Sequence, residues 1–433
     1  MKLFRFCIAA AACVIAAATQ AAEPLKDPHK KFIRVSPTHN LAAAIGRAQP
    51  GVTVLLADGL YRIAVPLVLR KPDVWIRSES GDRDNVILDG RLPDKPLTPL
   101  TRENCVNEII AIRASFVTIA DLTIRYARDH GIHLFPQNKG RIENALMHNI
   151  RVYDCGQQLI KANSFGTPPQ WVDRVVLEDS LIEFVDNSIM QQTGESFYTG
   201  GLDVHGGKDW HIRRNVFRNI QREGKMMEHA VHMWSGSRDT IIEQNTFIDC
   251  FRAVGLGMKT KAWGKVRLYH QPGTVDPYHD HVLGIVSNNV VFNRKGIHLE
   301  SGIELMNVSG TKVYHNTVVS HDKPFSSIEY RWPETTVQIS NNIVSHTIMK
   351  RDGAEGVLTT NIQNAPSDLF VNYADGDLHL MKNATIAIDR GTPGKTAARA
   401  DSPEQKLPRL TLFDIDGEKR DDTPDIGADE VMK

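Results

Sequence analysis

Titratable residues recur at one position of a short apolar pattern, and these are the residues of the chain best suited to chemistry. Seven segments read apolar, x, apolar, and a strand that buries both apolar side chains turns the middle one outward. In chain order, the middle residues are His133, Lys161, Asp203, His232, Gly255, Glu304 and Glu329. We call these seven the central row. Imidazole, ammonium and carboxylate groups together can remove a proton, donate one and neutralise an anion.

A second row follows two residues further along the same segments. It consists of Phe135, Asn163, His205, Trp234, Gly257, Met306 and Arg331. If consecutive segments form adjacent strands about 4.8 Å apart, Lys161, Asp203 and His232 become neighbours. Glu304 and Glu329 then form another adjacent pair. The two rows together predict a patch with an acid, a base, a cation and a ring for stacking.

Gly255 and Gly257 lack side chains, and we expect them to leave a notch across the patch. A sugar chain in the notch would stack on Trp234, and its hydroxyls would meet Asp203. The predicted substrate contacts are Asp203, Trp234, His133, Gly255, Lys259 and Tyr269. Lys259 and Tyr269 belong to a long basic and aromatic insertion, residues 259–281, whose charge suits an anionic polysaccharide.

The elements that must align these residues follow from a repeat. An apolar residue, two further residues and then Asn or Asp recur at intervals of 26 to 44 residues. The repeated positions are Asp121, Asn149, Asp179, Asn215, Asn245, Asn289, Asn316 and Asn342. A minimum near 26 with occasional longer intervals is typical of a stack of similar coils with loop insertions. The repeat therefore predicts a solenoid.

Segments such as 117–124, 240–247 and 311–319 are short, rich in β-branched residues and close to period two, so the coils are built from strands. No amphipathic helical repeat is visible between residues 112 and 344, so the predicted fold class is all-β. Stacked parallel coils would place each Asn side chain above the next, where the amides can hydrogen-bond. We assign this Asn stack to structure rather than to chemistry.

Both ends of the chain depart from the repeat. Residues 1–22 combine Lys2 and Arg5 with a short apolar run and small residues, which predicts a signal peptide and an exported protein, periplasmic or secreted. Residues 23–374 are expected to form the solenoid, including an N-terminal capping helix over 40–48 that keeps the first strand from pairing. Residues 375–433 are expected to form an irregular end cover.

Charge and cysteine content exclude several classes of protein. The chain has 51 Lys+Arg and 51 Asp+Glu and no basic run, which argues against a nucleic-acid partner. No second apolar segment is long enough to predict a membrane span. After the leader, Cys105, Cys155 and Cys250 are too sparse for a disulfide scaffold, and we expect them to be buried apolar residues.

Several motifs resemble those of one group of proteins. They are Asp58-Gly-Leu-Tyr61 after a short strand, the repeated Asn pattern, residues 376–381 with 387–391, and Asp425-Ile-Gly-Ala-Asp-Glu430. They are similar to secreted bacterial right-handed parallel β-helix proteins, among them polysaccharide lyases and alginate C5-epimerases. The resemblance implies a right-handed parallel β-helix. Residues 276–281 resemble the Asp-Pro-His-Asp signature of the epimerases, but Tyr278 interrupts it, so that role is not transferred.

The hypothesis that follows is a polysaccharide lyase that cleaves a uronic-acid-containing chain by β-elimination. His232 is the predicted base, with His205 or Lys161 as alternatives, and Arg331 or Lys161 would neutralise the substrate carboxylate. A Ca²⁺ ion would be held by Asp203 or by the Glu304 and Glu329 pair.

Two alternatives stay open. A retaining glycoside hydrolase would use Glu304 and Glu329, whose carboxyl groups on adjacent strands would stand about 5 to 5.5 Å apart. A non-catalytic glycan-binding or adhesive β-helix would use the aromatic residues to hold sugar.

Overall fold

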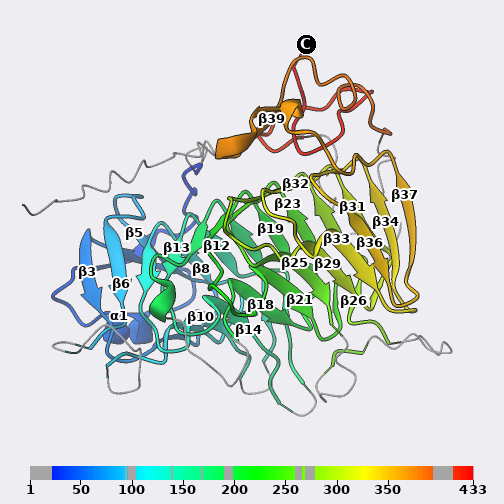
Figure 1. Cartoon of the computed structure of the whole chain (residues 1–433). Coiled ribbons are helices and arrows are strands. Elements are labelled where there is room, and N and C mark those ends of the chain that lie inside the picture. The colour runs from blue at the N-terminus through cyan, green and yellow to red at the C-terminus, as the bar shows by residue number, and fades with distance from the viewer. Residues whose placement is uncertain are drawn as a thin grey trace, which may run out of the picture.

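Three long parallel sheets form the body of the molecule (Figure 1). The computed structural model describes residues 22–92, 95, 104–137, 140–166, 169–189, 198–258, 266–268, 278–393 and 413–432. The predicted signal peptide falls almost wholly outside these residues and stays a prediction. Each turn of the chain contributes one strand to each sheet, so the architecture is a parallel β-helix, as the repeat predicts.

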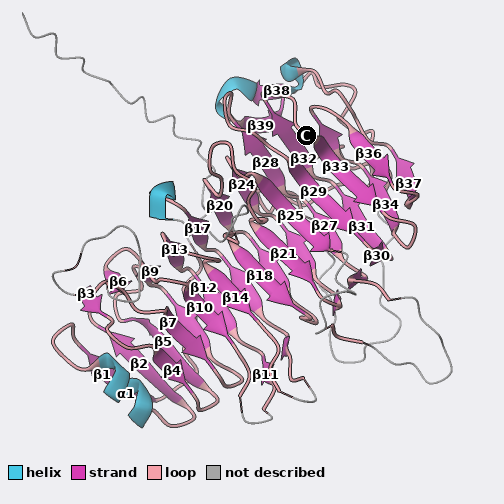
Figure 2. Cartoon of the chain, turned by 60° about the horizontal axis from the view of Figure 1, so that its bottom comes forward, coloured by secondary structure: helices cyan, strands magenta, loops and turns pink. Residues whose placement is uncertain are grey.

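Sheet C carries the central row and has ten strands. In chain order they are β4 (Leu67–Leu69), β7 (Glu108–Ile112), β10 (His130–Leu134), β14 (Ile160–Ala162), β18 (Leu202–His205), β21 (Val231–Trp234), β25 (Arg252–Gly257), β29 (Ser301–Met306), β33 (Ser326–Arg331) and β36 (Ile348–Arg351). Figure 2 shows β10 to β33 side by side along the coil.

Sheets A and B form the other two faces. Sheet A contains β1 (Lys31–Val35), β2 (Val52–Leu56), β5 (Val74–Ser78), β8 (Thr118–Ala120), β12 (Leu146–His148), β16 (Val176–Glu178), β19 (His211–Arg213), β23 (Ile241–Glu243), β27 (Ile285–Ser287), β31 (Thr311–Tyr314), β34 (Thr336–Ser340) and β37 (Glu355–Thr359). Sheet B contains β3 (Gly59–Arg62), β6 (Val86–Asp89), β9 (Thr123–Arg125), β13 (Arg151–Tyr153), β17 (Leu181–Glu183), β20 (Val216–Arg218), β24 (Thr246–Ile248), β28 (Val290–Asn293), β32 (Thr317–Ser320) and β35 (Ile343–Val344).

Shorter elements lie at the corners and beyond the last coil. They are β11 (Ile142–Glu143) with β15 (Val172–Asp173); β22 (Ser237–Arg238), β26 (His281–Val282) and β30 (Val308–Ser309); the antiparallel pair β38 (Phe370–Asn372) and β39 (Asp377–Leu380); and the 3₁₀ turns η1 (Asn187–Ile189), η2 (Ser367–Leu369) and η3 (Tyr373–Asp375). One apolar core runs through the coils, because inward residues of all three sheets meet there.

The Asn stack is present, with a shift of one residue in its first part. Six asparagines are linked by five hydrogen bonds, each from Nδ2 of one to Oδ1 of the next at 2.9 to 3.0 Å. These six, the Asn ladder, are Asn215, Asn245, Asn289, Asn316, Asn342 and Asn361. Asp121, Asn149 and Asp179 instead occupy the preceding left-handed turn position, and Ser180 takes the ladder position in its coil. The sequence pattern alone does not separate these two adjacent polar positions.

The N-terminal end is capped as predicted, with one difference. Helix α1 (Leu41–Arg47) begins after Asn40, whose side chain accepts a hydrogen bond from the Ala43 backbone, and it packs against β4 and β1. The expectation that the helix leaves the first strand unpaired is wrong, because β1 precedes the helix and pairs with β2 in parallel.

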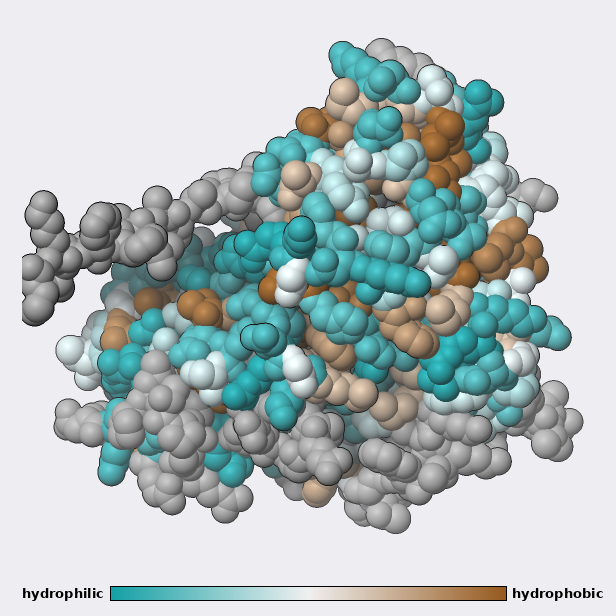
Figure 3. Space-filling model, in the orientation of Figure 1, coloured by the Kyte–Doolittle hydropathy of each residue, from teal (hydrophilic) through white to brown (hydrophobic). Residues whose placement is uncertain are grey.

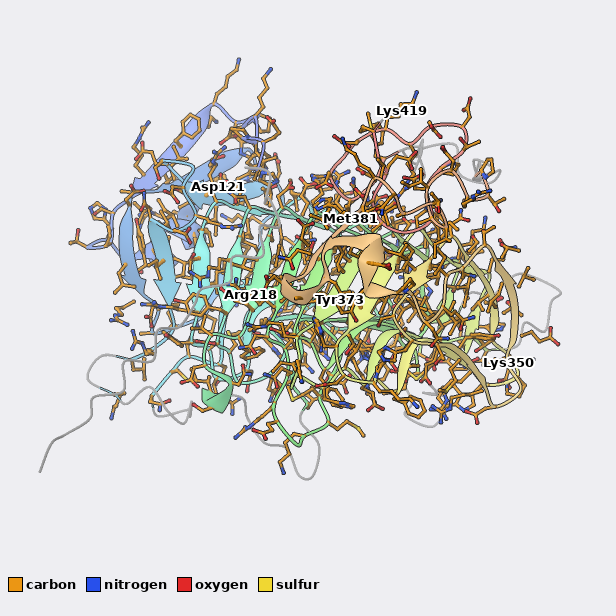
Figure 4. The ribbon with its side chains drawn as sticks, turned by 45° about the horizontal axis from the view of Figure 1, so that its top comes forward. Asp121, Arg218, Lys350, Tyr373, Met381 and Lys419 are labelled. Carbon is orange, nitrogen blue, oxygen red and sulfur yellow. The ribbon has the colours of Figure 1, made fainter. Side chains whose placement is uncertain are left out.

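The C-terminal segment packs on the side of the coil. Leu369, Phe370 and Leu380 are buried against Phe292 and Val319, which belong to strands of sheet B. Figure 4 shows Tyr373 and Met381 on this segment where it lies across the coil. The strand at the far end, β37, is exposed along its whole length. The segment therefore covers a flank in the described residues.

The helices, the surface and the cysteines can each be compared with the expectations from composition. Among the described residues, no helix combines the length and apolar character needed to cross a membrane. On the face shown in Figure 3, hydrophilic residues dominate and hydrophobic ones are scattered among them. Cys105, Cys155 and Cys250 are buried, as the sequence predicts, and form no disulfide in the part of the chain that the structure describes.

Candidate functional site

The central row has the register that the sequence predicts. His133 is paired with Lys161, Lys161 with Asp203, and Asp203 with His232. The row continues through Gly255 to Glu304 and then to Glu329. In the second row, His205 pairs with Trp234. Residues up to two hundred positions apart therefore form one line on sheet C, and strand pairing confirms this part of the prediction.

The row is nevertheless buried, which differs from the expectation of a solvent-facing strand. Lys161, Asp203, His232 and Glu329 are each at most 3% exposed. Their apolar neighbours belong to the core, so the row points away from the core as predicted. Side chains just before the strands, including Tyr198 and Glu228, contact the row from outside. Sequence alternation gives the direction of a side chain and does not reveal what packs over it.

Lys161 is the centre of a polar network on β14 and β18. Its ammonium group donates to the Asp203 carboxylate and to the Tyr198 hydroxyl, and it lies 2.9 Å from His205 Nε2. Trp234 Nε1 donates to the other Asp203 oxygen at 2.6 Å. We call Lys161, Tyr198, Asp203 and His205 the Lys161 network. Lys161 and Asp203 are buried, whereas 22% of the His205 side chain is exposed.

Burial and neighbouring charges shift the pKa values of His205, Tyr198 and Asp203 in different directions. Burial and the Lys161 ammonium lower the pKa of His205, so its imidazole is neutral near pH 7. Burial and the Asp203 carboxylate raise the pKa of Tyr198, which keeps the phenol protonated. Burial opposes charge on Asp203, yet Lys161 holds the Asp203 pKa well below its usual range. A neutral base and a protonated acid thus contact the same cation.

His232 is a poorer base than the sequence predicts. Its Nε2 lies 3.1 Å from the Gly257 carbonyl, and its Nδ1 lies 3.3 Å from Glu228 Oε2. Burial opposes its charged form, but the Glu228 carboxylate outweighs this effect and raises the pKa of His232. Because the ring is 1% exposed and both nitrogens face partners, it has no free lone pair toward solvent.

Trp234 is not open for sugar stacking. Its indole is 6% exposed and lies parallel to the His232 ring at a centroid distance of 5.2 Å. The His205 ring contacts it at 4.3 Å. The expectation of a stacking platform is therefore wrong for this arrangement, because the two imidazoles already occupy the indole.

The predicted notch at Gly255 is filled. A Cβ atom at this position would lie 2.6 Å from the His229 imidazole, so the ring occupies the space that the glycine leaves. His229 Nε2 donates to Glu304 Oε2 at 2.8 Å. Sequence alternation placed no side chain here because His229 comes from the segment before β21, outside the strand pattern.

Glu304 and Glu329 form a coupled pair. Burial and the neighbouring Glu304 carboxylate raise the pKa of Glu329 to about 7. Burial opposes charge on Glu304 as well, but His229 outweighs it and lowers the Glu304 pKa. Arg351 donates to Glu329 at 3.0 Å. The alternative of a retaining hydrolase that uses this pair stays a prediction.

The predicted calcium ligands do not fit Ca²⁺, which takes six to eight oxygen ligands. Both Asp203 oxygens already accept hydrogen bonds from Lys161 and Trp234. Glu304 and Glu329 accept from His229 and Arg351. A different group of described residues, Glu228, His229 and His232, brings three ligand atoms within 4.8 Å of one another.

The remaining predicted residues lie apart from the Lys161 network. Arg331 is on β33, four strands from His205 or about 19 Å, and it is paired with Asp352. His133 Nδ1 is 2.5 Å from Glu108. Lys259 and Tyr269 lie outside the described residues, so their predicted substrate contacts stay predictions.

Sequence reasoning missed the residues that border the row from outside. Tyr198, Glu228 and His229 precede the strands, and Arg252 lies at the start of β25 near Glu304. One signal was available: Glu228, His229 and His232 place three ligand-type residues within five positions. Strand periodicity does not select them, because residues 228 and 229 precede the first strand residue, Val231.

Comparisons with known proteins identify the fold. Residues 108–270 match a sequence family described as a right handed beta helix region. The solved structure of pectate lyase Pel9A is 11% identical, with a TM-score of 0.54 over 93% of this chain and 97% of that one. XylC in complex with xylose is 10% identical, with a TM-score of 0.52 over 93% of this chain and 98% of that one.

An alginate lyase from Paenibacillus sp. is 13% identical, with a TM-score of 0.39 over 77% of this chain and 99% of that one. No curated protein matches the chain in sequence. The chain is a right-handed parallel β-helix, a fold that it shares with the solved pectate lyase.

Proposed function

We propose that the protein is an exported polysaccharide lyase that cleaves a uronic-acid-containing chain by β-elimination at the Lys161 network. The observation that carries the proposal is the contact of a neutral imidazole and a protonated phenol with one ammonium group. His205, rather than His232, is the base in this proposal. The fold shared with a pectate lyase and the predicted leader support the same class.

The chemistry assigns one role to each member. When the substrate carboxylate draws the Lys161 ammonium away from His205 Nε2, that nitrogen removes the proton from C5 of the uronate. The electron pair forms the C4–C5 double bond as the C4–O bond breaks. The Tyr198 hydroxyl gives its proton to the leaving oxygen. A proton must then return from the His205 imidazolium to the Tyr198 phenolate, directly or through solvent, before the next turnover. The elimination needs neither an oxidant nor a metal ion.

Lys161 supplies the positive charge that this reaction needs. Removal of the C5 proton develops negative charge on the uronate carboxylate, which an ammonium group in a buried setting stabilises strongly. Asp203 holds that ammonium in place and is itself fixed by Trp234. Arg331 is too distant for this role, and no step depends on calcium.

An assay for the product tests the proposal. The purified mature chain would be incubated with alginate, pectate, glycosaminoglycans and neutral glucans, and ultraviolet absorbance would report an unsaturated uronate. We expect His205→Ala and Tyr198→Phe each to lower kcat/KM by about 10² to 10⁴. The matched control is His298→Ala, which changes an exposed histidine outside the network.

The same assay distinguishes the alternatives. New reducing ends without ultraviolet absorbance would identify a hydrolase, and sugar binding with neither signal would identify an adhesive protein. Full activity in His205→Ala would show that another group is the base. Because the pKa of His205 is lowered, we expect kcat/KM to stay high below pH 6.5 and to fall only when the imidazole becomes protonated.

A further inference from the structure

A second cluster borders the central row one strand from the Lys161 network. Glu228, His229 and His232 direct one ligand atom each into a common space, and these atoms all lie within 4.8 Å of one another. Glu228 Oε2 is 3.3 Å from His232 Nδ1 and 3.8 Å from His229 Nδ1. The side chains of His229 and His232 are 1% and 2% exposed. This geometry does not depend on the proposed elimination chemistry.

The outer nitrogens of both imidazoles are already engaged. His232 Nε2 lies 3.1 Å from the Gly257 carbonyl, which only accepts hydrogen bonds, so this nitrogen carries the hydrogen. His229 Nε2 donates in the same way to the Glu304 carboxylate at 2.8 Å. In the neutral rings both Nδ1 lone pairs therefore face Glu228. A carboxylate or carbonyl that fixes the far nitrogen is the arrangement found behind metal-bound histidines.

Two of the three inward atoms make no hydrogen bond. His229 Nδ1 and Glu228 Oε2 are buried and face each other at 3.8 Å, and the other described group near Glu228 Oε2 is His232 Nδ1 at 3.3 Å, too poorly aligned for a hydrogen bond. Buried polar atoms without partners are costly, and two acceptors that face each other repel. A cation placed between them would satisfy both.

We propose that Glu228, His229 and His232 form a binding site for a divalent transition-metal ion of the zinc class. Two imidazoles and one carboxylate suit Zn²⁺, whereas Ca²⁺ and Mg²⁺ prefer oxygen ligands alone. Tetrahedral bonds of about 2.0 to 2.2 Å place ligand atoms about 3.3 to 3.6 Å apart. The observed separations of 3.3 and 3.8 Å are close to this requirement. Three protein ligands leave a fourth position for water or another ligand.

Gly255 makes the site possible. The His229 ring occupies the space beside this glycine, and a Cβ atom there would lie 2.6 Å from His229 Nε2. Any larger residue would push the imidazole away from Glu304 and turn its Nδ1 out of the cluster. The glycine that predicts an open notch for sugar thus accommodates a ligand side chain.

Metal titration of the full chain tests this site. The chelator-treated protein would be titrated with Zn²⁺, Co²⁺ and Ca²⁺ by calorimetry, and the visible spectrum of the Co²⁺ form would report nitrogen and oxygen ligation. We expect one equivalent of Zn²⁺ and at least tenfold weaker Ca²⁺ binding. Glu228→Gln, which keeps the shape of the side chain, and Gly255→Ala are expected to weaken Zn²⁺ binding at least tenfold.

The matched control is His211→Gln, which changes a histidine paired with Glu243 on sheet A. It should leave Zn²⁺ affinity unchanged. Absence of stoichiometric Zn²⁺ binding, or equal affinity in Glu228→Gln and the unaltered chain, would overturn the proposal. If a variant fails to fold by circular dichroism, the Co²⁺ spectrum of the unaltered chain decides, because a spectrum of oxygen ligands alone would also overturn it. Loss of elimination activity in His205→Ala has no bearing on these results.

Discussion

The Asn ladder and the central row are both stacks of polar side chains in register, yet they differ in how well they are satisfied. In the ladder, one residue type repeats and each amide donates to the next at 2.9 to 3.0 Å. In and beside the row, the residue types differ from strand to strand, and buried atoms such as His229 Nδ1 have no hydrogen-bond partner. A side-chain amide both donates and accepts, so a stack of identical amides completes its own hydrogen bonds. In a stack of different charged groups, each group needs a suitable partner on the next strand. We infer that the ladder serves the fold and the row serves chemistry.

The largest expected effect comes from breaking one charge pair in the row. Lys161→Met leaves the Asp203 carboxylate buried without its cation, and we expect a loss of about 3 to 5 kcal/mol in the free energy of unfolding. Lys161→Met combined with Asp203→Asn removes both charges and keeps an acceptor for Trp234, so it should be less destabilising. Urea unfolding measures both. Equal losses would show that the two charges do not compensate each other.

A single break in the ladder should cost somewhat less. Asn289→Ala removes the acceptor of the Asn245 amide and the donor to Asn316, and all three residues are at most 1% exposed. We expect a loss of about 2 to 4 kcal/mol from the atoms left unpaired. Asn361→Ala, at the half-buried end of the ladder, is the control and should cost about 1 kcal/mol. If both variants unfold at the same urea concentration, the ladder is not a continuous buried network.

The smallest expected effect is a difference in pH dependence. The Asn ladder has no group that titrates, but Lys161 holds the pKa of the buried Asp203 well below its usual range. Stability from Asp203 is therefore fully present above about pH 4 and is lost as the pH falls toward its folded-state pKa, by about 1.4 kcal/mol per pH unit. The unaltered chain should lose more stability in acid than the Lys161→Met, Asp203→Asn double variant. Parallel curves for the two would contradict this assignment.

Much of the fold follows from residue patterns. The Asn repeat and the β-branched segments predict stacked strands, and the apolar, x, apolar segments predict the register of all seven residues in the central row. Strand alternation and the Asn repeat act within a few residues and recur in every coil, so an error in one coil shifts a position by only one residue. The shift at Asp179 and Ser180 shows their limit, because two polar residues in succession satisfy the same pattern.

The candidate site was predicted less well. Lys161, Asp203 and His205 do meet, but Tyr198, Glu228 and His229 enter from irregular segments that have no period. The base predicted from chemistry alone, His232, faces Glu228 and is buried. Arg331, predicted to neutralise the substrate carboxylate, lies four strands along the coil from His205.

The sequence by itself determined the coil, its register and the line along which ionisable residues gather, because strand alternation and strand stacking depend on near neighbours in the chain. Only the tertiary structure decided which of those residues are covered, which nitrogen of each imidazole is engaged, and that His229 fills the space beside Gly255. Burial and proton affinity are set by side chains from several coils at once, and no periodic pattern in one coil encodes them.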